Sequence, residues 1–459
     1  MRVADASSPA SSALRSTPEP TVAVYGLGYV GLPTAAILAE AGLTVTGIDL
    51  DAELVALVDA GRVRHHHDEA GVPELIARAA ASGRLGASTE PVPADVHVIA
   101  VGTPIKPDKS PDLDAVEAVA RAIGGVLRRG DLVIVESTVP PLTCEGLVAD
   151  AIFAVSGLRH ATDYLLAHCP ERVLPGNLLD ELVHNDRLVG GTSPEATAAA
   201  ASLYRRFVRG AVIETDARTA ETAKLLENTY RDVNIALANE LAALAASVGV
   251  DADAAFALAN RHPRVNLHRP SIGVGGHCIP VDPWFLVAID PAEARLLRTA
   301  REINDSLPGR VADAVRAHLG DADRVTVLGL SYKPDVDDMR ESPSIDVVRH
   351  LAADGRLRVD VVEPHCTVLP AGLSDLPNVR LVSMEQAARA EGLVVVLTPH
   401  KAFGGLLAQL PSAVDARELL YASRRRSAAA DEALAERGVA RPVGGPYVPV
   451  AAEVPAGRV

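Results

Sequence analysis

The stretch TVAVYGLGYVG at residues 21–31 runs from a short apolar segment into a glycine-rich turn, and residues 33–41 continue at helical spacing. This order predicts a strand, a tight turn and a helix. Gly26 would permit the turn, Gly28 would let the backbone approach a pyrophosphate, and Gly31 would let the helix pack closely on the strand. The helix N-terminus would face the anion. The stretch therefore predicts a dinucleotide-binding βαβ unit.

An acidic residue stands where such a unit needs one. Asp49 ends the next predicted strand, 18 residues after Gly31, where a carboxylate would accept hydrogen bonds from the adenosine ribose. Asp51 adds negative charge that would repel a 2′-phosphate, so the pattern favours NAD over NADP. Tyr29 and Val30 complete the predicted cofactor turn. The alternative is an ordinary glycine turn followed by a surface aspartate.

The same alternation of apolar runs and helical stretches extends outward along the chain. Further apolar runs lie at 44–48, 96–101, 132–136 and 164–168, then at 325–330, 358–362 and 393–397. Between the two sets, residues 216–249 form a long stretch without Gly or Pro that predicts one long helix. We therefore expect an α/β protein with two Rossmann-like doubly wound domains joined by a long central helix.

These expectations divide the chain into five parts. They are a disordered lead-in at 1–20, an NAD-binding domain at 21–213, a central helical and dimerisation domain at 214–310, a second Rossmann-like domain at 311–425, and a tail at 426–459. At about 100–200 residues per domain, 459 residues suffice for such an arrangement.

Composition excludes several functions. The net charge of −15 argues against a nucleic-acid or lipid surface, and 3% aromatic residues leave few platforms for stacking bases. No apolar run has the length of a signal peptide or a membrane span. The four cysteines are widely spaced, which indicates reduced thiols and a cytoplasmic protein.

Two threonines follow predicted strands. Thr103 lies in VGTP at 101–104, and Thr138 lies in ESTVP at 136–140. Ligands of open α/β sheets bind at the carboxyl ends of strands, so both are expected beside the cofactor. Each could equally be a capping residue of an ordinary turn.

The segment GVGGHCIPVDP at 273–283 is the candidate catalytic loop. Its glycines and prolines suit a backbone that approaches a ligand, and Cys278 lies in its middle between His277 and Asp282. Such polar neighbours suit a thiol that reacts as its thiolate. An isolated cysteine is more often inert, and the other three cysteines are expected to be structural.

The predicted long helix carries Lys224, Asn228 and Arg231 at helical spacing, which would place them on one face. Such a stripe could simply be solvated. A cation and an amide in a cleft could instead hold the oxygen of a reacting alcohol.

Five blocks in order resemble the UDP-glucose/GDP-mannose dehydrogenase family over residues 21–420. These are GLGYVGLPTA at 26–35, PERVLPG at 170–176, the helix with Lys224 and Asn228, GVGGHCIPVDPWF at 273–285, and GLSYKPDVDDMRESP at 329–343. The resemblance implies NAD-dependent oxidation of a nucleotide sugar's C6 alcohol to a carboxylate, with Cys278 forming a thiohemiacetal and then a thioester. It also implies a UDP-sugar substrate, a homodimer built around the long helix, and a product used for surface polysaccharides.

The resemblance also assigns roles to individual residues. Lys224 and Asn228 would stabilise the oxyanion, Thr138 and Asp282 would order water or a proton relay, and Glu171 would act as acid or base. Arg340 would face the cofactor, and Lys333 would bind the nucleotide sugar. Arg264 would reach the same ligand, from a partner subunit if the protein is a dimer. The remaining residues expected to bind substrate are Arg172, Val173, Leu174, Arg231, Gly275 and His277.

Within the family, NRHPRVN at 260–266 and Val281, where UDP-glucose enzymes have Lys, resemble the branch that oxidises UDP-N-acetyl-D-mannosamine. Gly102 departs from that branch, which usually has Pro there. UDP-N-acetylglucosamine, UDP-glucose and GDP-mannose stay open as substrates. Two functions of other kinds also stay open: a sensor without turnover, and an alcohol dehydrogenase that stops at the aldehyde. No metal is expected, because His65–His67 lack accompanying ligands.

Overall fold

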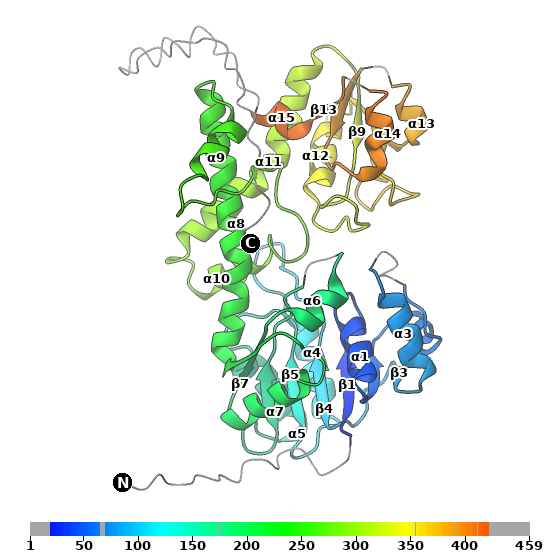
Figure 1. The fold of residues 1–459 in the computed structure, drawn as a ribbon, viewed down its shortest axis with the longest axis vertical. Helices are drawn as coiled ribbons and strands as arrows, with labels where there is room; N and C mark the ends of the chain where they lie inside the picture. The colour runs from blue at the N-terminus through cyan, green and yellow to red at the C-terminus, as the bar shows by residue number, and fades with distance from the viewer. Residues whose placement is uncertain are drawn as a thin grey trace.

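The computed structural model describes residues 19–64, 69–173, 176–353, 355–390, 392–410 and 412–421. Two α/β units are joined by α8 (Ala217–Ser247), which runs from the lower sheet to the side of the upper unit (Figure 1). The predicted fold class is confirmed. The predicted tail lies outside the described residues, as does the lead-in except for residues 19 and 20.

The N-terminal sheet has eight strands in the order β3-β2-β1-β4-β5-β6-β7-β8. Their bounds are Thr21–Tyr25 (β1), Thr44–Ile48 (β2), Leu85–Ser88 (β3), Val96–Ile99 (β4), Leu132–Val135 (β5), Leu165–His168 (β6), Arg187–Gly191 (β7) and Val212–Asp216 (β8). All neighbours are parallel except β6 and β7. The crossover between β3-β2-β1 and β4-β5-β6 creates the switch point at which open α/β sheets bind ligands.

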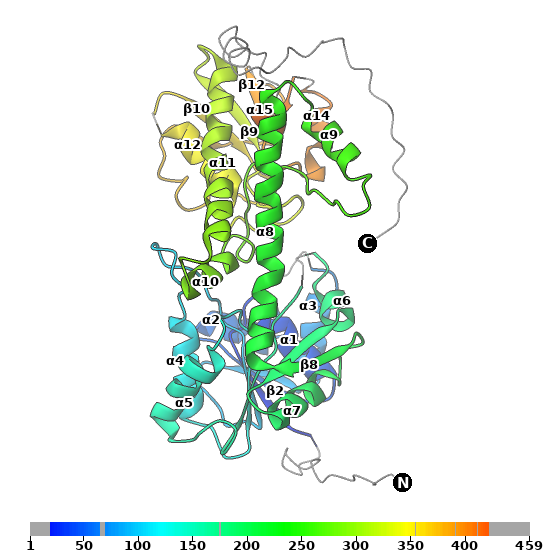
Figure 2. The ribbon, with the colours of Figure 1, turned by 90° about the vertical axis from the view of Figure 1, so that its left-hand side faces the viewer.

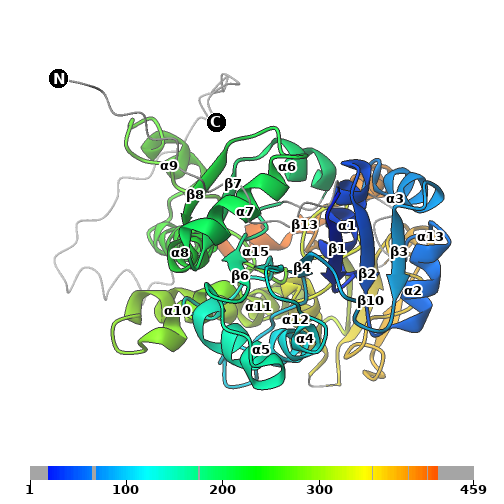
Figure 3. The same ribbon diagram turned by 90° about the horizontal axis from the view of Figure 1, so that it is seen from below.

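Helices cover both faces of this sheet (Figure 3). Helices α1, α3 and α7 pack on one face and α4 and α5 on the other, around cores built mainly of Val, Leu, Ile and Ala. Their bounds are Gly31–Glu40 (α1), Ala52–Asp59 (α2), Val72–Ala81 (α3), Asp114–Gly124 (α4), Cys144–Val148 (a π-helix), Ala149–Ser156 (α5), Leu178–His184 (α6) and Pro194–Tyr204 (α7). Because the chain has few aromatic residues, the layers on either side of the sheet are filled by aliphatic side chains.

The central segment is helical. Besides α8 it contains α9 (Ala252–Ala259), α10 (Asp282–Ile289) and α11 (Arg295–Leu319), and α11 lies alongside α8 (Figure 2). A buried network fixes this pair: Asp232 of α8 accepts hydrogen bonds from Arg301 and from Asn304 (2.9 Å) of α11. None of the helices among the described residues combines the length and hydropathy that crossing a bilayer requires.

The C-terminal unit contains a five-stranded parallel sheet in the order β11-β10-β9-β12-β13. Its strands are Arg324–Leu328 (β9), Arg358–Val362 (β10), Val379–Leu381 (β11), Leu393–Val396 (β12) and Val414–Asp415 (β13). Its helices are Pro343–Ala352 (α12), Met384–Ala387 (α13), Lys401–Phe403 (a 3-10 helix), Gly404–Leu407 (α14) and Ala416–Tyr421 (α15). The segment between β9 and α12 faces the N-terminal unit and forms part of the site.

Candidate active site

The cysteine loop is held between α10 and the C-terminal unit. The Cys278 carbonyl accepts hydrogen bonds from the backbone of Val281 (3.0 Å) and Asp282 (2.9 Å), which closes the turn onto the start of α10. A Cβ atom on Gly275 would lie 2.6 Å from Cδ of Pro343 and 2.8 Å from Cβ of Tyr332. Because only glycine fits there, the loop can pack directly against residues 332–343.

Cys278 is surrounded by ionisable side chains. Burial raises the pKa of its thiol to about 12; Asp282 and Glu171 act in the same direction, whereas Lys224 and Arg340 oppose them. The resting side chain is therefore a thiol at neutral pH. Its reaction as a nucleophile requires a neighbouring base to take the proton.

Asp282 is a carboxylate close enough to Cys278 to raise the pKa of its thiol. Its carboxylate is almost fully buried and accepts a 2.6 Å hydrogen bond from Nδ2 of Asn228. Burial raises the pKa of Asp282 to about 6, while Lys224 and the Asn228 hydrogen bond lower it. Lys224 and Asn228, one turn apart on α8, are both buried. The structure thus brings these three predicted residues together with Cys278.

Glu171 faces the same group. Burial raises the pKa of its carboxyl, and the Lys224 ammonium opposes that rise. Its Oε1 is buried and has no hydrogen-bond partner among the residues that the structure describes. An unpartnered buried oxygen of this kind is suited to a substrate hydroxyl or a water molecule.

Other residues predicted to bind substrate lie in different surroundings. Arg172 forms an ion pair with Glu227 (2.7 Å) and donates to the Asp186 carbonyl (3.0 Å), so its guanidinium already serves the fold. Val173 packs against the N-terminal core. Arg231 is exposed, unlike Lys224 and Asn228, although the helical spacing predicts a shared face. Leu174 and His65–His67 lie outside the described residues.

The glycine turn has the steric features that dinucleotide binding requires. Gly26 has φ of +94°, and a Cβ atom there would lie 2.6 Å from the Ala100 carbonyl oxygen. A Cβ atom on Gly31, the first residue of α1, would lie 1.9 Å from the Gly26 oxygen. Gly28 has no neighbouring atom within 4 Å of such a position. Gly26 and Gly31 are needed for packing, whereas Gly28 leaves the turn open toward a ligand.

Asp49 fixes this turn to the end of β2. One oxygen of its carboxylate accepts a hydrogen bond from the backbone N–H of Leu27 (2.9 Å), and the other accepts one from that of Asp51 (3.0 Å). Asp51 was expected to add negative charge beside the ribose, but it forms an ion pair with Arg64. This pairing lowers the pKa of Asp51 to about 2. Arg64 offsets the negative charge of Asp51, so repulsion of a 2′-phosphate depends mainly on Asp49.

A cavity of about 660 Å³ lies between the two units. Gly28 and Tyr29 line it from the N-terminal side and Arg340 from the C-terminal side. Arg340 donates two hydrogen bonds to the carboxylate of Asp338 (2.9 and 2.7 Å), which also lies 3.8 Å from Nδ1 of His277. The open turn, the carboxylate at β2 and the cavity together fit a dinucleotide.

Thr103 and Thr138 meet at the sheet's carboxyl edge, where Oγ1 of Thr103 donates to the carbonyl of Thr138 (2.7 Å). Val30 lies at the start of α1. Lys333 is half-buried in the loop after β9, and Arg264 is exposed in the loop after α9.

Three family models match the chain in succession. They describe the NAD binding domain, the central domain and the UDP binding domain of the UDP-glucose/GDP-mannose dehydrogenase family, at residues 20–208, 218–306 and 326–424. The chain belongs to the UDP-glucose/GDP-mannose dehydrogenase family. Its cofactor is NAD, and the cavity beside the glycine turn is the site whose residues fit it.

Individual relatives of known name share most of the chain. An NDP-N-acetyl-D-galactosaminuronic acid dehydrogenase of Ralstonia solanacearum is 47% identical over 83% of this chain and 91% of its own. A UDP-N-acetyl-D-mannosamine dehydrogenase of Campylobacter jejuni is 44% identical over 83% and 96%. The solved UDP-N-acetyl-mannosamine dehydrogenase of S. aureus superposes with a TM-score of 0.77 at 39% identity, covering 89% and 96%.

Several residues of this dehydrogenase's site lie outside the predicted set. Glu221 accepts hydrogen bonds from the backbone of Leu142 (2.7 Å) and Cys144 (2.9 Å), and thereby fixes the turn after Thr138. Its position three residues before Lys224 on one helix is a signal that could have revealed it. Glu69 accepts hydrogen bonds from the Tyr29 hydroxyl and from the backbone N–H of Gly176 (2.6 Å). No sequence pattern around Glu69 indicates this role.

Proposed function

We propose that this dehydrogenase oxidises the C6 alcohol of UDP-N-acetyl-D-mannosamine to the carboxylate, with two NAD consumed per sugar. The observation that carries the proposal is the position of Cys278 among Lys224, Asn228 and Asp282, within the electrostatic reach of Arg340, which lines the interdomain cavity. Binding of a cofactor alone would not need a thiol, a cation and a base held together. The names of the Campylobacter and S. aureus relatives support the choice of sugar.

In the first oxidation, the hydroxyl proton passes to Asp282 and from there to solvent, while Lys224 and Asn228 stabilise the developing oxyanion at C6. NAD, when bound, accepts a hydride in each of the two oxidations. Between them Cys278 attacks: Sγ bonds to C6 of the aldehyde as the C=O π bond opens, and the thiol proton passes by way of Asp282 to the former carbonyl oxygen. This thiohemiacetal is tetrahedral, so it can release the second hydride, whereas the trigonal aldehyde cannot.

Loss of the second hydride, with the hydroxyl proton passing to Asp282, leaves a thioester. Water, positioned by Thr138 and Glu171, attacks its carbonyl carbon, the C–S bond breaks, and the thiolate of Cys278 is reprotonated. The balance is one alcohol, one water and two NAD converted into one carboxylate, two NADH and three protons. Glu171 suits this step because its buried Oε1 is available to a water molecule.

The remaining assignments follow the location of each side chain. Tyr29, Val30, Asp49, Thr103 and Arg340 border the cofactor region. Gly275, His277 and Lys333 border the nucleotide-sugar region, together with the C-terminal unit at about 311–425 that the family model describes as UDP binding. Arg172 would act indirectly, by holding residues 170–173 against Glu227 of α8.

A second sugar has support of its own. The Ralstonia relative named for N-acetyl-galactosaminuronic acid is 47% identical, slightly above the 44% of the Campylobacter enzyme. An NADH-production assay over UDP- and GDP-sugars, with mass identification of products, separates the candidates. The proposal expects the highest kcat/KM with UDP-N-acetyl-D-mannosamine, and a higher value for UDP-N-acetyl-D-galactosamine would replace it.

The four-electron outcome has a direct test. Purified enzyme should produce two NADH per uronic acid, and Cys278→Ser should form no acid while still binding NAD. Cys366→Ser is the matched control, because Cys366 is a half-exposed cysteine in the C-terminal unit. One NADH per sugar with free aldehyde, or acid formation by Cys278→Ser, would refute the mechanism.

We further propose a homodimer formed through α8. Leu226, Tyr230, Leu237 and Leu244 are exposed, and their spacing puts them on one stripe. This stripe lies on the side of α8 opposite Lys224, so a partner could cover it without closing the site. Leu237→Arg should give monomers in light scattering, whereas Val368→Arg, at another exposed apolar residue, should not. A monomeric parent enzyme would contradict the proposal.

The four free cysteines and the need for NAD support a cytoplasmic location.

A further inference from the structure

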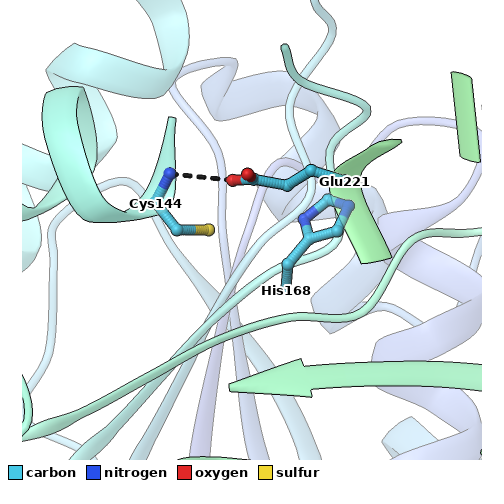
Figure 4. Close-up of side chains that lie close together, drawn as sticks. All are labelled: Cys144, His168 and Glu221. Atoms are coloured by element: carbon cyan, nitrogen blue, oxygen red, sulfur yellow. Dashed lines mark hydrogen bonds between the residues drawn. The ribbon is translucent and has the colours of Figure 1, made fainter. Parts of the chain in front are cut away.

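A buried cluster below the active site plays no part in the proposed reaction. Cys144 lies on the π-helix, His168 ends β6 and Glu221 lies near the start of α8 (Figure 4). All three are almost fully buried, and their ligand atoms lie within 4.8 Å of one another. Figure 4 shows the Cys144 sulfur pointing toward the Glu221 carboxylate and the His168 ring.

His168 is the unusual member of this cluster. Neither ring nitrogen has a well-aligned hydrogen-bond partner among the residues that the structure describes, although the side chain is wholly buried. The nearest candidate is the backbone of Val135, whose contact with the ring is poorly aligned. An unsatisfied polar group at such a site costs about 1–3 kcal/mol, so a group that binds the nitrogen is expected there. Lys224, the nearby cation, cannot serve as an acceptor for an imidazole N–H.

Glu221 is already oriented toward this space. Two backbone N–H groups, of Leu142 and Cys144, donate one hydrogen bond to each of its oxygens, at 2.7 and 2.9 Å. Each oxygen keeps a lone pair, and the two hydrogen bonds fix the direction of the carboxylate. Outer hydrogen bonds of this kind commonly orient a metal-binding carboxylate.

We propose that Cys144, His168 and Glu221 form a buried site for a zinc ion, with a water molecule as the fourth ligand. One sulfur, one nitrogen and one oxygen donor match the ligand preferences of zinc, and ligands in its tetrahedral sites lie about 3.5 Å apart. Thiolate and carboxylate together balance the charge of Zn²⁺. Binding replaces the thiol proton of Cys144, which leaves to solvent. The run His65–His67 is not part of this ligand set.

The metal would fasten three elements of the active-site wall. Glu221 precedes Lys224 by one turn of α8, and His168 precedes Glu171 by three residues. Cys144 follows the turn at Leu142, whose φ of +74° is in the left-handed region. A zinc ion would therefore hold the catalytic lysine and glutamate in place without touching the substrate.

The test uses full-length protein without a histidine tag, produced in zinc-supplemented medium because the buried site would exclude metal added later. Elemental analysis should find about one zinc per chain. X-ray absorption should show one sulfur at about 2.3 Å and nitrogen or oxygen at about 2.0–2.2 Å. A zinc content below a tenth of an ion per chain, or a zinc spectrum without sulfur, would overturn the proposal and leave a bound water as the partner of His168.

Variants assign the site. Cys144→Thr and His168→Gln should each lower the zinc content at least tenfold. Cys169→Ser is the matched control, because Cys169 is equally buried but hydrogen-bonds to the Leu188 carbonyl (3.1 Å), and it should retain zinc. Zinc retained in both cluster variants would overturn the assignment. If neither variant folds, the absorption spectrum of the unaltered enzyme still decides.

Discussion

The hydrogen bond from Asn228 to Asp282 should set the acidic limb of the pH profile. Asp282 must be ionised to accept the thiol proton, and burial holds its pKa at about 6. The 2.6 Å bond from Nδ2 of Asn228 stabilises the ionised form. Asn228→Ala removes this donor and leaves the carboxylate buried, so the pKa of Asp282 should rise.

The size of the effect follows from the charge on the acceptor. A hydrogen bond to an ionised group contributes about 1.5–3 kcal/mol, and 1.36 kcal/mol corresponds to one pKa unit. The limb of kcat/KM should therefore move from about pH 6 to about pH 7 or above. At pH 6 the active fraction of enzyme would fall about fivefold, from a half to roughly a tenth. Asn228→Ala also removes oxyanion stabilisation, which lowers the maximum value of kcat/KM but does not change the pH of the acidic limb.

The assay is the pH dependence of kcat/KM for NADH production, which reports ionisation of the free enzyme. Asp282→Asn supplies the companion measurement, because it lacks the titrating group and its residual activity should show no limb near pH 6. Unchanged NAD affinity would show that Asn228→Ala keeps the fold. A limb that stays at the parent pH in Asn228→Ala would refute the role given to this pair.

Three further predictions concern the N-terminal unit. Gly28→Ala should keep the parent thermal stability but weaken NAD binding at least tenfold in a titration, because its Cβ meets only the open cofactor turn. Gly31→Ala should instead lower the melting temperature, because its Cβ would lie 1.9 Å from a carbonyl oxygen. Arg187→Met should reduce the free energy of unfolding by about 3–5 kcal/mol in denaturant titrations, because it removes the cation from the buried Glu136 carboxylate and leaves it only the Tyr204 hydroxyl as a donor. Equal stability of the two glycine variants, or a change below 1 kcal/mol for Arg187→Met, would contradict these expectations.

Periodicity and glycine placement were sufficient to predict most of the fold. The strand at 21–25, the turn at 26–31 and the long helix over 217–247 each depend on local patterns that the chain displays clearly. Five strands were not predicted, at 85–88, 187–191, 212–216, 379–381 and 414–415. The strand at 187–191 ends in two glycines and the strand at 212–216 is largely exposed, so neither sequence shows the alternation of apolar and polar residues that marks a strand. The other three have only two to four residues.

The site was harder to predict because its members meet only in space. Cys278 and Asp282 are neighbours in sequence, but the bond from Asn228 joins residues 54 positions apart. Arg64 cancels the charge of Asp51 across α2, and Glu227 binds Arg172 from another element. Such pairings depend on how helices dock on the sheet, and a single sequence does not encode them in any local spacing.

The glycines of the candidate catalytic loop allow its backbone to pack directly against the C-terminal unit. Residues 275 and 276 pack against Tyr332, and residues 273 and 275 pack against Pro343. The far end of the loop is fixed by the bond between Asp282 and α8. Cys278 is therefore attached to the C-terminal unit and to the central helix, whereas the glycine turn at residues 26–31 belongs to the other sheet. Any change in the angle between the two units would alter the distance from the thiol to the bound cofactor while leaving the thiol's own base in place. This arrangement suits the proposed reaction, in which one cofactor would leave and another would enter while the sugar stays bonded to Cys278.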